Sequence, residues 1–253
     1  MLKSGFVSLF RKEVNRFTKV FTQTVVTPMI TSLLYLVVFA HVLAERQMPG
    51  LNVNYIEFLV PGLVMMTVVQ NAFANSSSSM VQSKMNGSVI FMLLAPLSYI
   101  EVWGAYVGAA IVRGVIVGSG VYFASLIYVD FSMHSFVWAL VFAILAGTVL
   151  GGLGLIGGVL AEKYDHLSAF QNFVVMPLSF LSGVFYSIQS LPQPWGAISQ
   201  FNPLFYMIDG FRYGIIGVSD VNPWFSFTVA ASFAAAISIF CILLLRSGYR
   251  LRY

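Results

Sequence analysis

The chain has 253 residues, of which 58% are hydrophobic and 9% are charged, and its mean hydropathy is +0.86. Soluble domains carry about 25% charged residues, so this composition excludes a soluble globular protein and predicts one polytopic membrane domain over residues 1–253. The net charge of +4 indicates membrane orientation rather than nucleic-acid binding, and the single cysteine, Cys241, excludes a disulfide framework within one chain.

Apolar residues recur at helical spacing near the N-terminus. The steps between them are 4, 4, 3 and 4 residues, and basic residues fall mostly on the other side. We predict an amphipathic helix over residues 1–21 that lies at the membrane interface and meets anionic lipid headgroups. The alternative is an extension of the first membrane span. The apolar face consists of Phe6, Phe10, Val14, Phe17 and Phe21.

Six apolar runs are long enough to cross a bilayer as helices. Five of them carry no charged residue, and the third is interrupted only by Arg113. We therefore predict an all-α protein with six transmembrane helices. The runs are residues 22–44, 58–83, 102–129, 135–161, 167–186 and 221–245.

The basic residues are distributed unequally between the two faces that six spans define. Ten of the 13 Lys and Arg residues fall on the face that carries both termini, whereas only Arg46 and Arg212 fall on the other. Because cytoplasmic loops are enriched in Lys and Arg, we predict that both termini are cytoplasmic.

Polar residues form a face on the second span and recur in the fifth. On the second span they are spaced 4, 3 and 4 residues apart. Exposing such a row to lipid is costly, so we expect it to line a translocation pathway; helix–helix hydrogen bonding is the alternative. Pro177 in the fifth span permits either a hinge or a static kink. The candidate pathway residues are Asn71, Asn75, Ser78, Gln82, Gln171, Asn172 and Ser179.

Arg113 is a charge inside a membrane span, which costs about 2.5–3.5 kcal/mol on insertion scales. We expect it to form a structural ion pair with Glu101 or Glu162, or to extend toward the inner interface. Direct contact with a transported substrate is the alternative.

The stretch from residue 167 to residue 208 is uncharged but interrupted by four prolines. Irregular backbone at membrane depth survives only where protein or water satisfies its amide groups. A full seventh span would place Arg246, Arg250 and Arg252 outside, against the charge rule. We therefore predict short re-entrant helices over residues 187–215 on the outer face, between spans five and six.

The chain lacks several catalytic signatures. It has no GxxxxGK[ST] loop, no HExxH motif and no pair of carboxylates within the spans. Energy for transport is therefore expected to come from another protein. The cytoplasmic segments 84–98 and 162–168 are either simple connectors or docking surfaces for a soluble partner.

One stretch, residues 176–214, resembles the signature region of type-2 ABC exporter permeases, a bacterial family that includes drug, polysaccharide and lipid exporters. The similarity extends over nearly the whole chain, including FLVPGLVMM at residues 58–66 and APLSYIEVWGAYVGA at residues 95–109. The signature elements are Pro177, Ser182-Gly183, Leu191-Pro192, Trp195, Asn202-Pro203 and Arg212.

The resemblance implies a non-enzymatic permease subunit in the bacterial inner (plasma) membrane. It would pair with a second copy as a homodimer, contact membrane lipid, bind no nucleic acid and carry no cofactor or metal. Two copies of a separate cytoplasmic ABC ATPase would hold the ATP and Mg. Spans two and five would line the pathway.

The resemblance also assigns docking and gate residues. The coupling segment 84–98 and a second contact at 162–166 would dock the ATPase, and segment 187–215 would form an outer gate. Family members often carry polar residues where this chain has Val89, Ile90, Phe91 and Met92. The implied docking residues are Lys84, Asn86, Phe91, Glu162, Lys163 and Asp165, and the gate residues are Pro192, Trp195, Asn202, Pro203 and Arg212.

Two other classes of function compete with this reading. A secondary transporter or channel not coupled to ATP would need titratable residues in its core, where only Arg113 and Asp209 are available. A membrane-embedded enzyme would need a nucleophile, a metal cluster or an acid pair.

Overall fold

The computed structural model describes residues 2–43, 47–48, 51, 53–129 and 133–250. In this part of the chain every element longer than an isolated bridge is helical. Arg46 and Arg252, which entered the charge count, and Ala44, the predicted end of span one, lie outside the described residues.

Five helical stretches among the described residues are long and apolar enough to cross a membrane. They confirm the predicted spans one, two, three, four and six to within a few residues at the ends. The stretches are Thr22–Phe39, α3 (Tyr55–Met85), α5 (Tyr99–Ser125), α6 (Phe136–Leu160) and α11 (Pro223–Ser247).

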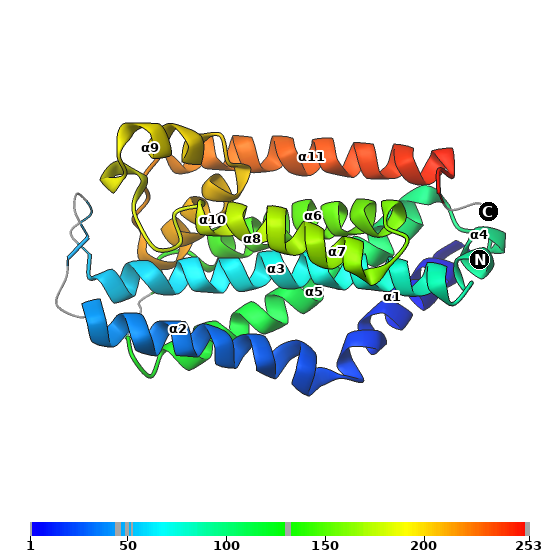
Figure 1. Ribbon diagram of the computed structural model, residues 1–253, viewed down its shortest axis with the longest axis horizontal. Coiled ribbons are helices and arrows are strands. Elements are labelled where there is room, and N and C mark those ends of the chain that lie inside the picture. Colours follow the sequence, from blue (N-terminus) through cyan, green and yellow to red (C-terminus); the bar gives the residue numbers. More distant parts are fainter. Residues whose placement is uncertain (1, 44–46, 49–50, 52, 130–132, 251–253) are drawn as a thin grey trace.

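Helix α3 is the central helix of the bundle and packs along α5 and α6 (Figure 1). Small residues allow the close approach. A Cβ atom added at Gly154 of α6 would overlap the backbone carbonyl oxygen of Phe73 in α3, and one at Gly158 would lie 2.9 Å from the carbonyl oxygen of Ser77. The glycine-rich stretch of span four therefore serves packing within the chain.

The N-terminal amphipathic helix is α1 (Leu2–Thr18), and it packs against α5. A Cβ atom at Gly108 of α5 would lie 3.2 Å from the Phe10 ring, so the absence of a side chain there makes room for α1. Phe17 and Glu13 of α1 are both buried. A π-helical turn, η1 (Thr22–Val26), separates this region from α2 (Thr27–Leu43).

The predicted fifth span is a run of three consecutive helical segments. These are α7 (Tyr164–Phe170), the π-helical turn η2 (Gln171–Val175) and α8 (Met176–Phe180). The run ends before the predicted residue 186 because Gly183 turns the backbone with φ +74°, a left-handed conformation that favours glycine. It is not among the five long membrane-crossing helices.

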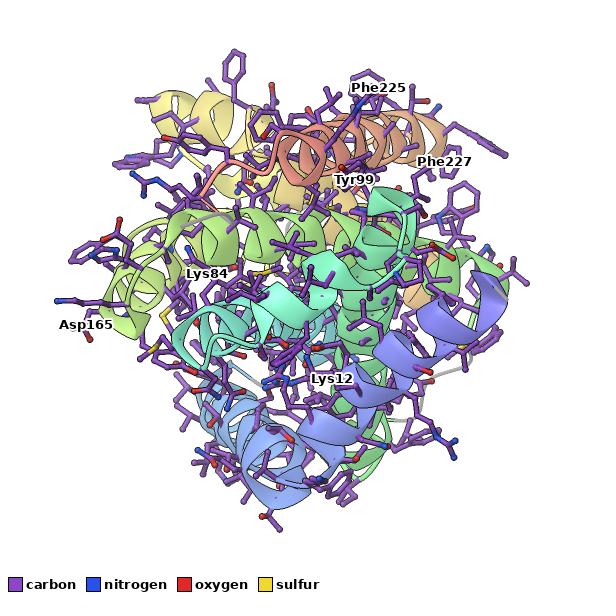
Figure 2. The ribbon with its side chains drawn as sticks, turned by 90° about the vertical axis from the view of Figure 1, so that its right-hand side faces the viewer. Lys12, Lys84, Tyr99, Asp165, Phe225 and Phe227 are labelled. Atoms are coloured by element: carbon purple, nitrogen blue, oxygen red, sulfur yellow. The ribbon has the colours of Figure 1, made fainter. Side chains whose placement is uncertain are left out.

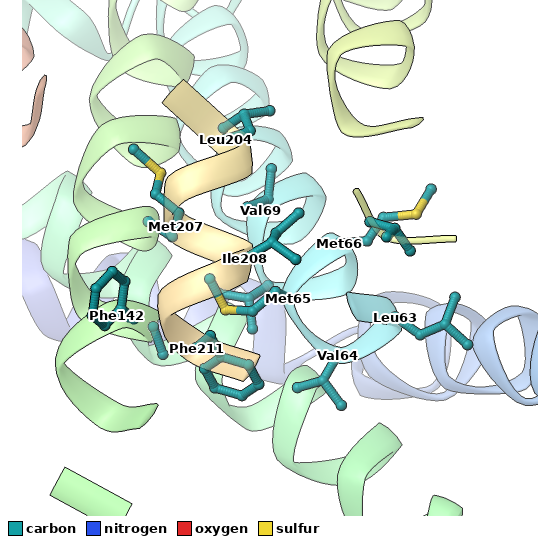
Figure 3. Packing of buried hydrophobic residues seen from close by; sticks show 14 of the residues in the cluster. Leu63, Val64, Met65, Met66, Val69, Phe142, Leu204, Met207, Ile208 and Phe211 are labelled. Carbon is teal, nitrogen blue, oxygen red and sulfur yellow. The ribbon is translucent and has the colours of Figure 1, made fainter. Parts of the chain in front are cut away.

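The segment between this run and α11 is a succession of short helices. They are η3 (Ile188–Ser190), α9 (Gln193–Gln200) and α10 (Pro203–Ile216). Helix α10 packs against α3, α6 and α11, and Figure 3 shows Met207, Ile208 and Phe211 of α10 facing apolar residues of α3 and Phe142 of α6.

The two ends of the bundle differ in what they carry. Helix α1 begins and α11 ends at one end, beside the short helix α4 (Val89–Leu94); we call this the terminal end (Figure 1). Helices α3, α6 and α11 begin at the opposite, distal end, where α9 also lies. The end of α10 is tied there by hydrogen bonds from the His134 and Ser135 amides to the carbonyls of Ile215 and Gly214, at 3.0 and 2.8 Å.

Candidate functional site

The polar face predicted on span two is divided between buried and open positions. Asn71 and Asn75 are buried, whereas Ser78 is half-buried and Gln82 is exposed. The open stripe of α3 consists of Gln70, Ala74, Ser78 and Gln82, every fourth residue along the helix. In the distal half of α3, the open stripe therefore differs from the predicted face by one residue: Gln70 and Ala74 are open in place of Asn71 and Asn75.

Arg16 of α1 occupies the terminal part of this stripe. Its guanidinium donates to the Asn75 side-chain oxygen at 3.0 Å, to the Asn75 carbonyl at 2.7 Å and to the Ser78 hydroxyl at 3.2 Å. Its charge is offset by the fully buried Glu13, whose carboxylate lies 3.6 Å from Nε of Arg16 and 3.2 Å from Lys12. The amphipathic helix thus sends one basic side chain into the bundle instead of toward lipid headgroups.

A cavity of about 290 Å³ opens beside the distal part of the stripe, and we call it the polar cavity. Five elements supply its polar lining. Among these residues are Gln23 of η1, Thr31 of α2, Gln70 and Asn71 of α3, Arg113 of α5 and Gln171 of η2. Both π-helical turns therefore contribute a glutamine to the same cavity. Such turns are rare and are frequently found at functional sites.

Arg113 reaches this cavity from α5 and is 9% exposed. Its Nη2 donates to the Asn71 side-chain oxygen at 3.1 Å. The carboxylates expected to pair with it are engaged elsewhere: Glu101 closes a capping box with Ser98 at the start of α5, and Glu162 lies 3.8 Å from Arg250. The prediction of an ion pair is therefore wrong, because the partner of Arg113 is the side-chain amide of Asn71.

The three candidate residues of span five have different surroundings. Gln171 lines the polar cavity, Asn172 is exposed, and Ser179 is buried with its hydroxyl donating to the Val175 carbonyl at 2.7 Å. The structure thus brings Asn71 and Gln171 together with Arg113, and it leaves Ser179 within its own helix.

At the distal end, a fully buried Arg212 joins segments on both sides of α10. Its Nη1 lies 3.8 Å from Asp209 and 3.9 Å from Asp220, and Nη2 donates to the Gly183 carbonyl at 2.6 Å. The guanidinium also lies over the Phe58 ring of α3, 3.7 Å from its centroid. Arg212 thereby ties α10 to the end of span five, to the loop before α11 and to α3.

The remaining residues predicted for the gate lie around α9. Pro192 and Trp195 are exposed. Asn202 is buried, accepts from the Leu204 amide at 3.0 Å to cap α10, and donates to the Leu178 carbonyl at 2.6 Å. Pro203 follows at the first position of α10, where its missing N–H costs no hydrogen bond.

At the terminal end, α4 presents apolar side chains outward. Phe91 is 76% exposed and Leu94 is 77% exposed. Asn86, Lys163 and Asp165 are exposed as well, and Figure 2, which views the bundle from the terminal end, places Asp165 at its periphery.

Lys84 and Glu162, the other two predicted docking residues, contact the chain itself. The Lys84 ammonium donates to the carbonyls of Val159 and Ala161 at 2.7 and 2.8 Å, which satisfies the end of α6. Glu162 faces Arg250, which also donates to the Leu160 carbonyl at 2.8 Å.

Sequence reasoning missed several residues of these sites. Gln70 and Gln23 line the cavity, Arg16 fills the stripe, and Asp220 pairs with Arg212. Gln70 could have been identified from the sequence, because it is a glutamine inside an apolar helix. Arg16 and Asp220 gave no such signal, because their partners lie on other elements.

The arrangement matches a known family of membrane proteins. A model of the ABC-2 type transporter family matches residues 4–216. The chain is 38% identical to the inner membrane transport permease YadH of Escherichia coli (strain K12) over 245 residues, which covers 97% of this chain and 96% of YadH. It is also 24% identical to nodulation protein J of Rhizobium leguminosarum bv. viciae, over 68% of this chain and 66% of that protein. This chain therefore belongs to the ABC-2 type transporter family and is a multi-pass transport permease.

Proposed function

We propose that two copies of this chain form the membrane part of an exporter that a separate ATPase drives. The polar cavity supports this most directly. It lies on the open edge made by α2, α3 and η2, and the membrane-crossing window of α2 is only 17% buried within one chain. A second copy facing that edge would enclose the cavity as part of a pathway between the two subunits.

The proposed topology has six spans, with the run from α7 through α8 as the fifth. Lys163 precedes this run beside the end of α6, and α9 follows it at the distal end. Since most of the basic residues gather at the terminal end, that end is proposed to be cytoplasmic. Helices α9 and α10 would then enter from and return to the outer face.

The terminal end offers the surface for an ATPase. Helix α4 exposes Phe91 and Leu94, and Lys163 and Asp165 at the start of α7 are exposed at the same end of the bundle. Exposed aromatic side chains that fill a pocket of a partner are typical of protein–protein hot spots. Because the apolar face of α4 points away from the bundle, we propose that it inserts into a pocket of the ATPase.

This proposal is tested by capturing the ATPase with the tagged chain from membranes that contain both. We expect the complex to hydrolyse ATP and the chain alone to be inactive. Phe91→Ala should reduce capture about tenfold or more, because truncating a hot-spot aromatic costs at least ~2 kcal/mol. Phe123→Ala is the matched control, since Phe123 is 67% exposed near the distal end of α5. Equal capture by the two variants would exclude α4 as the docking surface.

A further inference from the structure

The polar cavity carries a positive charge that no acidic group offsets. Every other buried charge in the described part of the chain has an opposite charge within 4 Å: Glu13 faces Lys12 and Arg16, and Arg212 faces Asp209 and Asp220. Arg113 instead has the neutral amide of Asn71. Among the described residues that line the cavity there is no Asp or Glu.

Hydrogen-bond donors without partners surround the same space. Nε of Arg113 and Nε2 of Gln70 are both buried and lack an acceptor among the described residues. Both residues line the cavity. Buried donors normally have partners, because leaving one unpaired costs about as much as its desolvation. The combination calls for a ligand that supplies acceptors and negative charge.

We propose that the polar cavity binds an oxyanion, a phosphate or carboxylate group, carried by the molecule that the permease transports. The guanidinium of Arg113 suits such a group because its planar fork matches two oxygens at once. Gln70 supplies a further donor, and the half-open cavity leaves the rest of the ligand to extend along the edge of α2 and η2. This inference rests on the proposed role of the cavity in the pathway and names the substrate class as an anionic amphiphile.

The test measures binding to the purified full-length chain in a neutral detergent, without ATPase or nucleotide. The probes are a short-chain phosphatidic acid, the diacylglycerol with the same acyl chains, and inorganic phosphate. We expect phosphatidic acid to bind at least tenfold more tightly than diacylglycerol, because a hydrogen bond to a charged group contributes more to the binding free energy than a hydrogen bond between neutral groups. Competition by inorganic phosphate would assign the site to free oxyanions as well, whereas its absence would restrict the site to amphiphile headgroups.

Two variants locate the binding at the cavity. Arg113→Gln removes the charge, and Gln70→Glu places a carboxylate in the cavity with almost no change in shape; each should weaken phosphatidic acid binding about tenfold or more. Arg246→Gln is the control, because it removes the same charge from an exposed position at the end of α11. The Gln70→Glu variant also guards against misfolding, since it gives Arg113 a partner.

Equal affinity for phosphatidic acid and diacylglycerol would overturn the proposal, and so would unchanged binding in Gln70→Glu. The outcome is separable from the proposed function. If the ATPase is captured but phosphatidic acid does not bind, the proposed oxyanion site is refuted and the proposed function is not. If phosphatidic acid binds but no ATPase is captured, the oxyanion site is supported and the proposed coupling to an ATPase is refuted.

Discussion

Arg212 shows how this chain keeps a charge inside a mostly apolar bundle. It is fully buried, yet two carboxylates, one carbonyl and one aromatic ring face its guanidinium. Asp209 also accepts from the backbone amide of Asp220 at 2.7 Å. Asp220 is held in turn by Ser187, whose hydroxyl donates to its carboxylate. The cluster therefore joins α10 to the loop before α11 through side chains of opposite charge, and joins both to the end of span five through hydrogen bonds.

This geometry predicts an order of stability between two substitutions. Arg212→Gln leaves two buried carboxylates without their cation, so it should lower the free energy of unfolding by about 3–5 kcal/mol. Asp209→Asn leaves Arg212 with Asp220 and keeps one acceptor, so its cost should be clearly smaller. The midpoint of thermal unfolding of the purified variants measures both. Asp209→Asn unfolding at the same temperature as Arg212→Gln, or below it, would contradict the assignment of Arg212 as the centre of the cluster.

At the scale of elements, the contact between α3 and α6 organises the bundle. The glycines of α6 do not all serve it. Gly154 faces the backbone of Phe73 in α3, whereas a Cβ atom at Gly157 would meet its nearest neighbour, a methyl group of Leu167, only at 3.8 Å. The two glycines lie one turn apart on one helix, which makes them a matched pair for separating packing from helix propensity.

We expect Gly154→Ala to destabilise the protein and Gly157→Ala to leave it unchanged or slightly more stable. The first forces α3 and α6 apart, and overpacking of this kind costs about 1–3 kcal/mol. The second adds a methyl group where there is room, and Ala is favoured over Gly in a helix by up to ~1 kcal/mol. Thermal unfolding in one detergent compares them directly. A loss of stability in both variants would mean that glycine is needed in α6 for flexibility and not for contact.

The elements themselves were largely predictable, because uncharged apolar runs define helices of this length almost regardless of their neighbours. The rotation of α3 about its axis was not, since it depends on neighbouring helices: Asn71 is buried against Arg113 of α5, whereas Gln70 stays open. The π-helical turns η1 and η2 carry no distinct local signal, so their convergence on one cavity emerges only in three dimensions. The basic side of α1 was expected to meet lipid headgroups, and the role of Arg16 could not be predicted because its partners on α3 are about 60 residues away in the sequence.

At the scale of the whole molecule, the central helix is enclosed and the peripheral helices α2 and α11 are open, and the polar cavity lies on the α2 edge. Helix α3 is surrounded by α5, α6 and α10, and its membrane-crossing window is 83% buried. The window that includes α2 is 17% buried and borders the polar cavity. A solitary chain in a bilayer would leave this polar edge facing lipid, which is costly. The polar cavity therefore favours assembly through the edge of α2, α3 and η2.

The proposed topology places the terminal and distal ends on opposite sides of the membrane, and the chain is well suited to a labelling test of this. Its single cysteine, Cys241, is 1% exposed, so wild-type protein should not react with a membrane-impermeant maleimide. Single cysteines at exposed positions then report sidedness. We expect Gln200→Cys on α9 to be labelled in intact cells, and Lys163→Cys and Ser247→Cys to be labelled only after the membrane is opened.

Each position tests a different step of the topology. Residues 163 and 200 flank the short run from α7 through α8, so labelling of both from one side would show that this run does not cross the membrane. Residue 247 ends α11, and its labelling in intact cells would make α10 a full span and reverse the C-terminal side. The expected pattern, outside for 200 and inside for 163 and 247, requires α9 and α10 to enter and leave on the same face. That arrangement leaves the buried Arg212 cluster anchored on the outer side, across the membrane from the exposed face of α4.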